Sequence, residues 1–354
     1  MNRFTLKQFA VPALLSLSLT CVGCAADKGN GDADNSLARE VVDSVASTFA
    51  KRIIEGTHVV AQDSAEVEPE SGQPTEVRRV AAMVVVDSVL YATFNRGLAV
   101  YDFRSGLVDI IPSESRLTSV LAYEDRLYVG GDQLYQLVDS ALVPNPVEMV
   151  GAVTSLARYD DRLIIGTTSG LYATGRFGNE LLLDDVSVSS LASDQQGLWV
   201  GTGGQGLYCY SNGEIKKRFL LRNRSVFDFV NCLAFGPNHL YVGTDEGVFT
   251  YNGGRWRQLT IEDGLPDNAI IAVDASSWVV YLSTGSGVVS FFNNEFSPVH
   301  KLESEQVNSF CLFGSSIITG TDDHGILMKK GPVLRTLIPP TTGIDIKSIS
   351  FSVY

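Results

Sequence analysis

The sequence predicts an all-β protein, a β-propeller of four-stranded antiparallel blades. Three observations support this: a strand like Leu-Tyr-Val-Gly-Thr recurs seven times, a tight turn follows each copy, and a strand with a small residue precedes each copy. The recurring strand begins at intervals of 35 to 42 residues, at Leu90, Leu127, Leu163, Leu198, Leu240, Val280 and Ile317. A period of about 40 residues with several short strands per unit is typical of propeller blades.

Each unit reads as four strands. In the fifth unit, residues 230–234, 240–244, 248–251 and 256–259 are rich in β-branched and aromatic residues and are separated by Gly, Asn and Asp. The second turn carries a glycine at Gly97, Gly170, Gly206, Gly247, Gly287 and Gly325, whereas the second unit has Asp132-Gln133 there. Glycine lets the chain reverse cheaply because it tolerates positive φ.

A small side chain lies eight positions before each recurring strand, at Ala82, Ser119, Ser155, Ser190, Cys232, Ala272 and Ser309. Val, Ile or Leu stands two residues earlier in most units. Blades converge on the propeller axis, where there is least room, so this pattern predicts the innermost strand of each blade. We interpret the serines as packing residues, with a chemical role as the alternative.

The number of blades depends on both ends of the chain. Ile346-Lys-Ser-Ile-Ser350 repeats the inner-strand pattern, and Ile53-Ile-Glu-Gly-Thr57 resembles the recurring strand 37 residues before Leu90. One strand cannot make a blade, so its partners have to come from the N-terminus. We therefore expect eight blades, closed by pairing of the two termini.

The alternative is seven blades preceded by a short N-terminal helix. Residues 36–55 place apolar side chains on one helical face, at Leu37, Val41, Val45, Phe49 and Ile53. Ser36 fits the N-cap position and Gly56 the C-terminus of such a helix. The expected organisation is an N-terminal segment over residues 37–76, either helix or closing strands, and a propeller over residues 77–354.

The fifth unit also carries a family resemblance. Leu240-Tyr-Val-Gly-Thr-Asp-Glu-Gly-Val-Phe-Thr-Tyr-Asn252, then Trp256 and Ile261-Glu-Asp-Gly-Leu-Pro-Asp-Asn268, resembles the two-component regulator propeller repeat. The hairpin half of this motif covers approximately residues 90–330, whereas the Glu-Asp-Gly-Leu-Pro half appears once. In that family the repeats build periplasmic sensing domains of hybrid histidine kinases, often in carbohydrate-responsive systems. The resemblance implies a propeller in an extracytoplasmic setting.

The first residues have the pattern of a secretion signal. Arg3 and Lys7 precede an apolar run, Ala10–Val22, that is too short to span a membrane. Val-Gly before Cys24 resembles the lipobox of bacterial lipoproteins, although Cys21 replaces the usual leucine. This resemblance implies that Cys24 is acylated. The alternatives are acylation at Cys21 and an ordinary cleaved signal.

The lipoprotein pattern also predicts where the protein resides. Residues 1–23 form the expected signal peptide, and the polar residues 24–36 read as a flexible tether. Ala25 and Ala26 follow the lipobox cysteine in place of aspartate, which by resemblance to lipoproteins of diderm bacteria implies the outer membrane. We therefore expect a protein of the bacterial cell envelope that contacts the membrane only through its N-terminal lipid.

Charge and cysteine content indicate which partners and which covalent links to expect. The chain has 40 acidic and 27 basic residues, a formal net charge of −13. This balance argues against nucleic acid and against an anionic membrane surface as partners. Cys209, Cys232 and Cys311 follow the signal region and lie in different units, so we expect small buried residues rather than disulfides.

Candidate catalytic and metal-binding residues are scarce. None of the four histidines lies at metal-ligand spacing from another histidine or a cysteine, and we expect no metal, no cofactor and no catalytic residue. The cluster Asp322-Asp-His324 could bind a cation or tune a base. Its position just before Gly325 is better explained by turn chemistry.

One stretch is unusually basic for an acidic protein. Cations crowd nine residues around the outer strand of the fourth unit and two phenylalanines follow, which gives Lys216, Lys217, Arg218, Arg222, Arg224, Phe227 and Phe229. We call this set the basic-aromatic segment. It could dock an acidic partner or an anionic glycan. Alternatively, lysine and arginine protect a solvated edge strand from aggregation.

Two classes of function follow from the sequence. We favour a non-catalytic binding or scaffold module for an envelope protein or glycan, because propeller loops on a rigid frame offer a surface for ligands. The alternative is an enzyme, a lyase or hydrolase acting on a polysaccharide or small molecule, with its site at the channel mouth.

Overall fold

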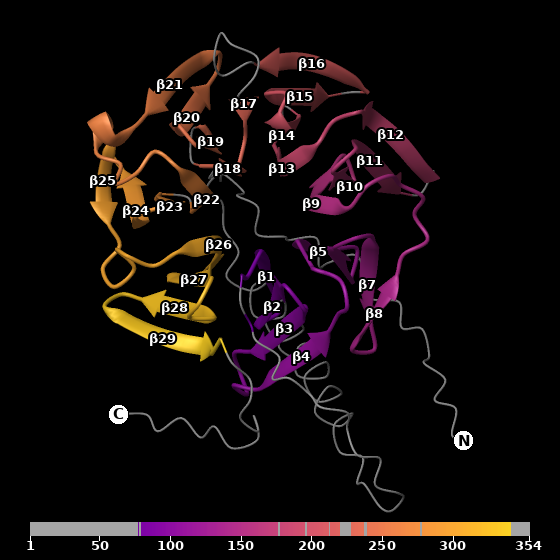
Figure 1. Ribbon diagram of the computed structural model, residues 1–354, viewed down its shortest axis with the longest axis horizontal. Coiled ribbons are helices and arrows are strands. Elements are labelled where there is room, and N and C mark those ends of the chain that lie inside the picture. The colour runs from indigo at the N-terminus through magenta and orange to yellow at the C-terminus, as the bar shows by residue number, and fades with distance from the viewer. Residues whose placement is uncertain are drawn as a thin grey trace, which may run out of the picture. The chain divides into compact units, whose positions relative to one another are not determined.

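The computed structural model describes residues 77, 79–175, 178–194, 197–211, 213–219, 228–236, 239–276 and 278–340. These residues form seven antiparallel sheets, the blades, arranged in a ring (Figure 1). Blade 1 consists of β1 (Ala82–Val86), β2 (Val89–Phe94), β3 (Gly97–Asp102) and β4 (Val108–Pro112), and blade 2 of β5 (Ser119–Tyr123), β6 (Arg126–Gly130), β7 (Leu134–Val138) and β8 (Ala141–Pro144). Blade 3 consists of β9 (Val153–Tyr159), β10 (Arg162–Thr167), β11 (Gly170–Gly175) and β12 (Gly178–Asp184), and blade 4 of β13 (Val188–Ser193), β14 (Leu198–Gly204), β15 (Leu207–Ser211) and β16 (Glu214–Phe219). Blade 5 consists of β18 (Cys232–Phe235), β19 (Leu240–Thr244), β20 (Gly247–Asn252) and β21 (Arg255–Leu259), blade 6 of β22 (Ile270–Ala275), β23 (Val280–Thr284), β24 (Gly287–Phe292) and β25 (Glu295–Pro298), and blade 7 of β26 (Val307–Phe313), β27 (Ser316–Thr321), β28 (Ile326–Lys330) and β29 (Val333–Ile338). A short strand, β17 (Asp228–Phe229), pairs with β14.

The structure confirms the four-stranded antiparallel blades and their inner strands. The first strand of each blade contacts the first strands of its neighbours, so these strands surround the axis (Figure 1). The small residue of each inner strand faces the glycine position of the recurring strand; Ser119 pairs with Gly130, and Cys232 with Gly243. The fourth strand of each blade lies at the rim of the seven-bladed ring, for example β29.

The expectation of eight blades is wrong, because blade 7 packs directly against blade 1. β26 contacts β1, and one apolar cluster joins Val80 and Leu90 of blade 1 to Ile318 and Ile338 of blade 7. No space remains between these two blades for another sheet. The segments that suggested an eighth blade, residues 53–57 and 346–350, lie outside the described residues, as does the helix expected over residues 36–55.

The glycine of the recurring strand is required by packing between blades. A Cβ atom on Gly166 would lie 2.5 Å from Val188, the residue that leads into the next blade, and a Cβ on Gly243 would lie 2.7 Å from Ile270. Val188 and Ile270 are almost completely buried. The apolar residue two positions before the small inner-strand residue therefore packs on the glycine of the preceding blade wherever that glycine is present, and this contact limits how closely the blades approach.

The threonine that follows this glycine fixes the next turn. In blade 5 the Thr244 hydroxyl donates to the carbonyl of Gly247 at 2.8 Å and accepts from the amide of Glu246 at 3.1 Å. The same pair of contacts recurs at Thr167, Thr202, Thr284 and Thr321. Leu-Tyr-Val-Gly-Thr thus encodes a strand, a contact between blades and a turn.

The Glu-Asp-Gly-Leu-Pro motif forms a fixed connection between blades 5 and 6. Its first residues form a 3-10 helix, η1 (Ile261–Asp263), in which Thr260 and Asp263 make a capping box. Gly264 ends the helix with φ +105°, and the buried Leu265 packs into the apolar cluster between the two blades. Within the described residues, η1 is the sole helical element. Neither it nor any other described segment is a helix long and apolar enough to cross a membrane.

Candidate functional site

The antiparallel strand order divides the connections between two faces of the ring. The turns between second and third strands and the connections between blades lie at the same end of the strands. We call this end the loop face. The hairpins between first and second strands and between third and fourth strands lie at the opposite end, the hairpin face.

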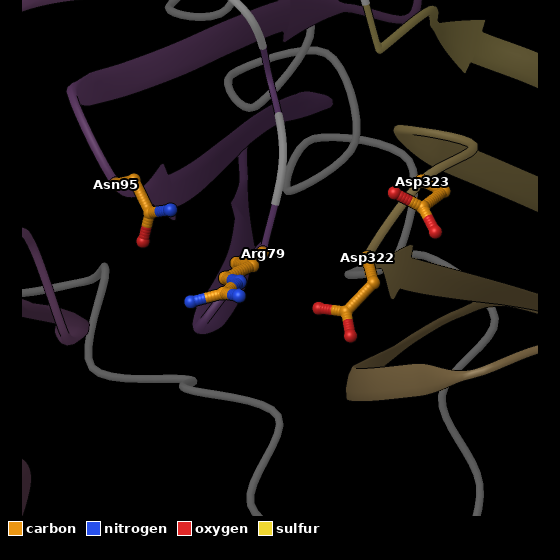
Figure 2. Close-up of a pocket in the computed structure, with 4 residues that line it drawn as sticks. All are labelled: Arg79, Asn95, Asp322 and Asp323. Atoms are coloured by element: carbon orange, nitrogen blue, oxygen red, sulfur yellow. The ribbon is translucent and has the colours of Figure 1, made fainter.

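A hollow lies on the loop face where the last blade meets the first. Its volume is about 340 Å³ and it is lined by Arg79, Asn95, Asp322 and Asp323. Arg79 immediately precedes blade 1, Asn95 lies in the turn between β2 and β3, and the two aspartates lie in the turn between β27 and β28. Figure 2 shows Arg79 between Asn95 and Asp322, with Asp323 on the same turn as Asp322. We call this site the seam hollow.

Hydrogen bonds hold the aspartate turn and Arg79 in place. The Asn308 side-chain amide donates to Asp322 Oδ1 at 2.6 Å, and the Arg79 amide donates to the Asp322 carbonyl at 3.4 Å. Arg79 has φ +54°, a conformation that a residue with a side chain seldom adopts. The equivalent turn of blade 5 has the same side-chain contact, since Asn231 donates to Asp245 Oδ1 at 2.8 Å.

The structure separates His324 from the aspartates that precede it in sequence. Its Nδ1 lies 2.8 Å from Glu305 Oε2, on the connection between blades 6 and 7. His300 Nδ1 lies 3.2 Å from Glu303 Oε1 on the same connection, and hydrogen bonds from the backbone and from His300 lower the pKa of Glu303. The described residues contain no group of three or more His, Cys, Asp or Glu side chains that could hold a metal ion.

The structure describes part of the basic-aromatic segment. Lys216 is exposed on the outer strand β16, where its Nζ lies 3.2 Å from Glu214 Oε2. Phe229 is 44% exposed on β17, which pairs with β14, so these two side chains belong to different strands of the blade 4 sheet. Lys217 and Arg218 also lie on β16, but their side chains are not among the described parts, and Arg222, Arg224 and Phe227 lie outside the described residues.

The described part of the propeller contains three cysteines, Cys209, Cys232 and Cys311. Cys209 is buried in the cluster between blades 4 and 5. Cys232 and Cys311 lie on inner strands, and burial raises the pKa of each thiol to about 12. They therefore act as small apolar side chains, which agrees with the prediction that they form no disulfide framework.

Sequence reasoning missed Arg79 and Asn95. Each has an arginine beside it in the sequence, Arg78 and Arg96, but neither pair forms a recognisable motif. Only their positions in the repeat could have indicated them. Arg79 directly precedes the apolar residue that leads into blade 1, and Asn95 lies in a turn between second and third strands, which the repeat places on the loop face. Only the closure of the ring brings them to Asp322 and Asp323.

No family model matches the chain, and no curated protein matches it. Among solved structures, the chain is similar to the extracellular domains of two hybrid two-component system proteins from B. thetaiotaomicron. One has a TM-score of 0.60 at 16% identity, and the other a TM-score of 0.51 at 22% identity; each alignment covers 72% of this chain and 39% of that structure. The WD40 β-propeller domain of Doa1 gives a TM-score of 0.57 at 15% identity, over 72% of this chain and 93% of that domain.

These likenesses support the propeller fold. The identities lie between 15% and 22%, so the comparisons carry the fold and not the binding properties of those proteins. The chain spans less than half the length of the two extracellular domains.

Proposed function

We propose that this chain is a lipid-anchored propeller of the bacterial cell envelope that binds a protein or glycan partner without catalysing a reaction. The loop face supports this role most. Its turns are fixed by threonine hydrogen bonds on a packed frame, and loops held in this way suit recognition. On this face His300 and His324 each lie within hydrogen-bond distance of a glutamate, which places polar side chains on the surface offered to a partner.

The anchor rests on the sequence around Cys24, which lies outside the described residues. To test it, Cys24→Ala is combined with an ordinary cleavable secretion signal in place of residues 1–23. This variant is expected in the soluble envelope fraction, while the parent stays with outer membranes, because one acylation site carries the attachment. Equal membrane association of the two chains would contradict the anchor.

Partner binding is tested by crosslinking in intact cells and identification of the crosslinked species. If the basic-aromatic segment docks the partner, reversing Lys216, Arg222 and Arg224 to Glu weakens capture, and added salt has the same effect because exposed charges are screened beyond about 8 Å. The control reverses three exposed cations, Arg104, Arg255 and Lys330, near hairpin-face turns. Equal loss in both variants would indicate a general charge effect. Turnover of a polysaccharide by the purified chain would favour the enzyme alternative.

A further inference from the structure

We propose that the seam hollow binds a small zwitterion of the α-amino acid class. This site is separate from the capture of a protein or glycan partner, and it requires neither the lipid anchor nor the basic-aromatic segment. Its four lining residues supply groups of both charges within one hollow of about 340 Å³.

Arg79 supplies the site for a carboxylate. A guanidinium presents planar donors that match the two oxygens of a carboxylate. The Arg79 side chain is exposed, and within the part of the chain that the structure describes no ion pair or hydrogen bond engages its guanidinium. Its backbone is held by the bond to the Asp322 carbonyl, so the side chain is presented from a fixed position.

The aspartate turn supplies the site for an ammonium group. Asn308 occupies one oxygen of Asp322, which leaves the second oxygen as an acceptor, and Asp323 is exposed on the same turn. An ammonium group carries three donors and favours nearby carboxylates. Asn95 adds a side chain that can both donate and accept.

The combination of charges excludes simpler ligands. A phosphate or a simple carboxylate that paired with Arg79 would lie close to two like charges at Asp322 and Asp323. A divalent cation lacks a ligand set here, because no described group of three or more suitable side chains exists. A ligand with one carboxylate and one ammonium group can pair with both the Arg79 guanidinium and the carboxylates of Asp322 and Asp323. The volume is at the lower end for ligand sites, which suits a molecule of amino-acid size.

The position of the site predicts a second effect of binding. Arg79 precedes blade 1 and the aspartates belong to blade 7, so a bound ligand bridges the first and last blades of the ring. Because the ligand needs the closed ring, it binds the folded state alone and raises the thermal midpoint.

The test is calorimetric titration of the purified full-length chain with L-alanine, L-glutamate and L-lysine, alongside thermal unfolding. We expect saturable binding and a raised midpoint with at least one amino acid. Propionate and propylamine, which each keep one charge, are expected to bind at least about tenfold more weakly, because one charge-assisted contact is lost. Propionate binding as tight as the amino acid would reduce the site to an anion site and overturn the proposal.

Variants locate the binding. Arg79→Met and Asp323→Asn change exposed side chains and are expected to weaken binding at least about tenfold with an unchanged midpoint in the absence of ligand. Asp245→Asn, at the equivalent turn of blade 5, is the matched control and should bind like the parent. The proposal fails if no amino acid binds saturably, or if Arg79→Met binds as tightly as Asp245→Asn.

Discussion

The Ser309 hydroxyl donates a 3.1 Å hydrogen bond to the carbonyl oxygen of Val80, a residue 229 positions earlier in the sequence. Val80 leads into blade 1 and is completely buried, and Ser309 is the small residue of the inner strand of blade 7. A similar bond occurs inside the ring, where the hydroxyl of Thr154, the residue before the small Ser155, donates to the Val188 carbonyl of the next blade at 2.7 Å. The two ends of the ring are therefore joined by a bond like those between consecutive blades.

Gly320→Ala tests this closure. A Cβ on Gly320 would lie 2.5 Å from the Ser309 hydroxyl and 2.5 Å from the Val80 side chain, so blades 7 and 1 have to move apart. Overpacking of this kind lowers the free energy of unfolding by about 1–3 kcal/mol, measured by chemical denaturation.

Gly203→Ala is the matched control for this substitution. Gly203 also lies near the end of a second strand, but a Cβ there meets its nearest neighbour at 3.6 Å, an ordinary contact. We expect a change well below that of Gly320→Ala. Equal effects of the two substitutions would mean that contact between blades 7 and 1 does not control stability.

Truncation tests the number of blades. A chain that ends at Pro340 keeps all seven blades, and we expect its thermal midpoint within about 3 °C of the parent. A chain that ends at Pro332 loses β29 and with it the buried Leu337 and Ile338, so we expect aggregation or a large fall in midpoint. Failure of the longer chain to fold would show that residues 341–354 contribute to the ring.

The repeat allowed most of the fold to be predicted. The period, the turn glycines and the small inner-strand residues identify four-stranded blades because each blade meets the same packing demands. Blade number was not predictable in this way, because the resemblance of Ile53–Thr57 and Ile346–Ser350 to blade strands says nothing about which blades touch. The decisive contact, Val80 on Gly320, resembles the contact of Val188 on Gly166 between consecutive blades but joins distant segments.

The candidate site was less accessible to sequence reasoning. The sequence shows the cluster Asp322-Asp-His324 and predicts that it lies in a turn before Gly325, which the structure confirms. The neighbours of these three residues in the fold could not be read from the sequence. His324 contacts Glu305, whereas Arg79 and Asn95 line the seam hollow together with Asp322 and Asp323. A site assembled from both ends of a closed ring leaves no local motif.

Thr244→Val tests the turn of the recurring motif. The hydroxyl of Thr244 is buried and makes hydrogen bonds to both Gly247 and Glu246, so its removal leaves a buried carbonyl without its donor. We expect a loss of about 1–2 kcal/mol in the free energy of unfolding, measured by denaturation. Thr250→Val is the control, because Thr250 is equally buried but its hydroxyl makes one long contact of 3.4 Å to Arg257. A larger loss for Thr250→Val would contradict the role assigned to the motif.

The inner strand of blade 6 carries a carboxyl group that links stability to pH. Burial raises the pKa of Asp274 from 3.8 to about 6, although its carboxylate accepts hydrogen bonds from the amides of Ala275 and Leu312. Leu312 lies on β26 of the next blade, and the charge of the Asp274 carboxylate also raises the pKa of the neighbouring Cys311 thiol. Because the pKa is raised on folding, the folded state holds the proton more tightly than the unfolded state.

Asp274→Asn therefore has an effect that depends on pH. In the parent, the contribution of this group to stability is greatest below about pH 4 and is lost as the pH rises through about 6, a difference of about 3 kcal/mol. Asparagine stays neutral and keeps an acceptor, so the variant should be more stable than the parent at pH 7.5, and the difference should shrink toward pH 4. Asp109→Asn is the matched control, since Asp109 also accepts from the next amide but is exposed. Denaturation curves at several pH values measure this, and a difference between variant and parent that stays constant from pH 4 to 7.5 would exclude Asp274 as the titrating group.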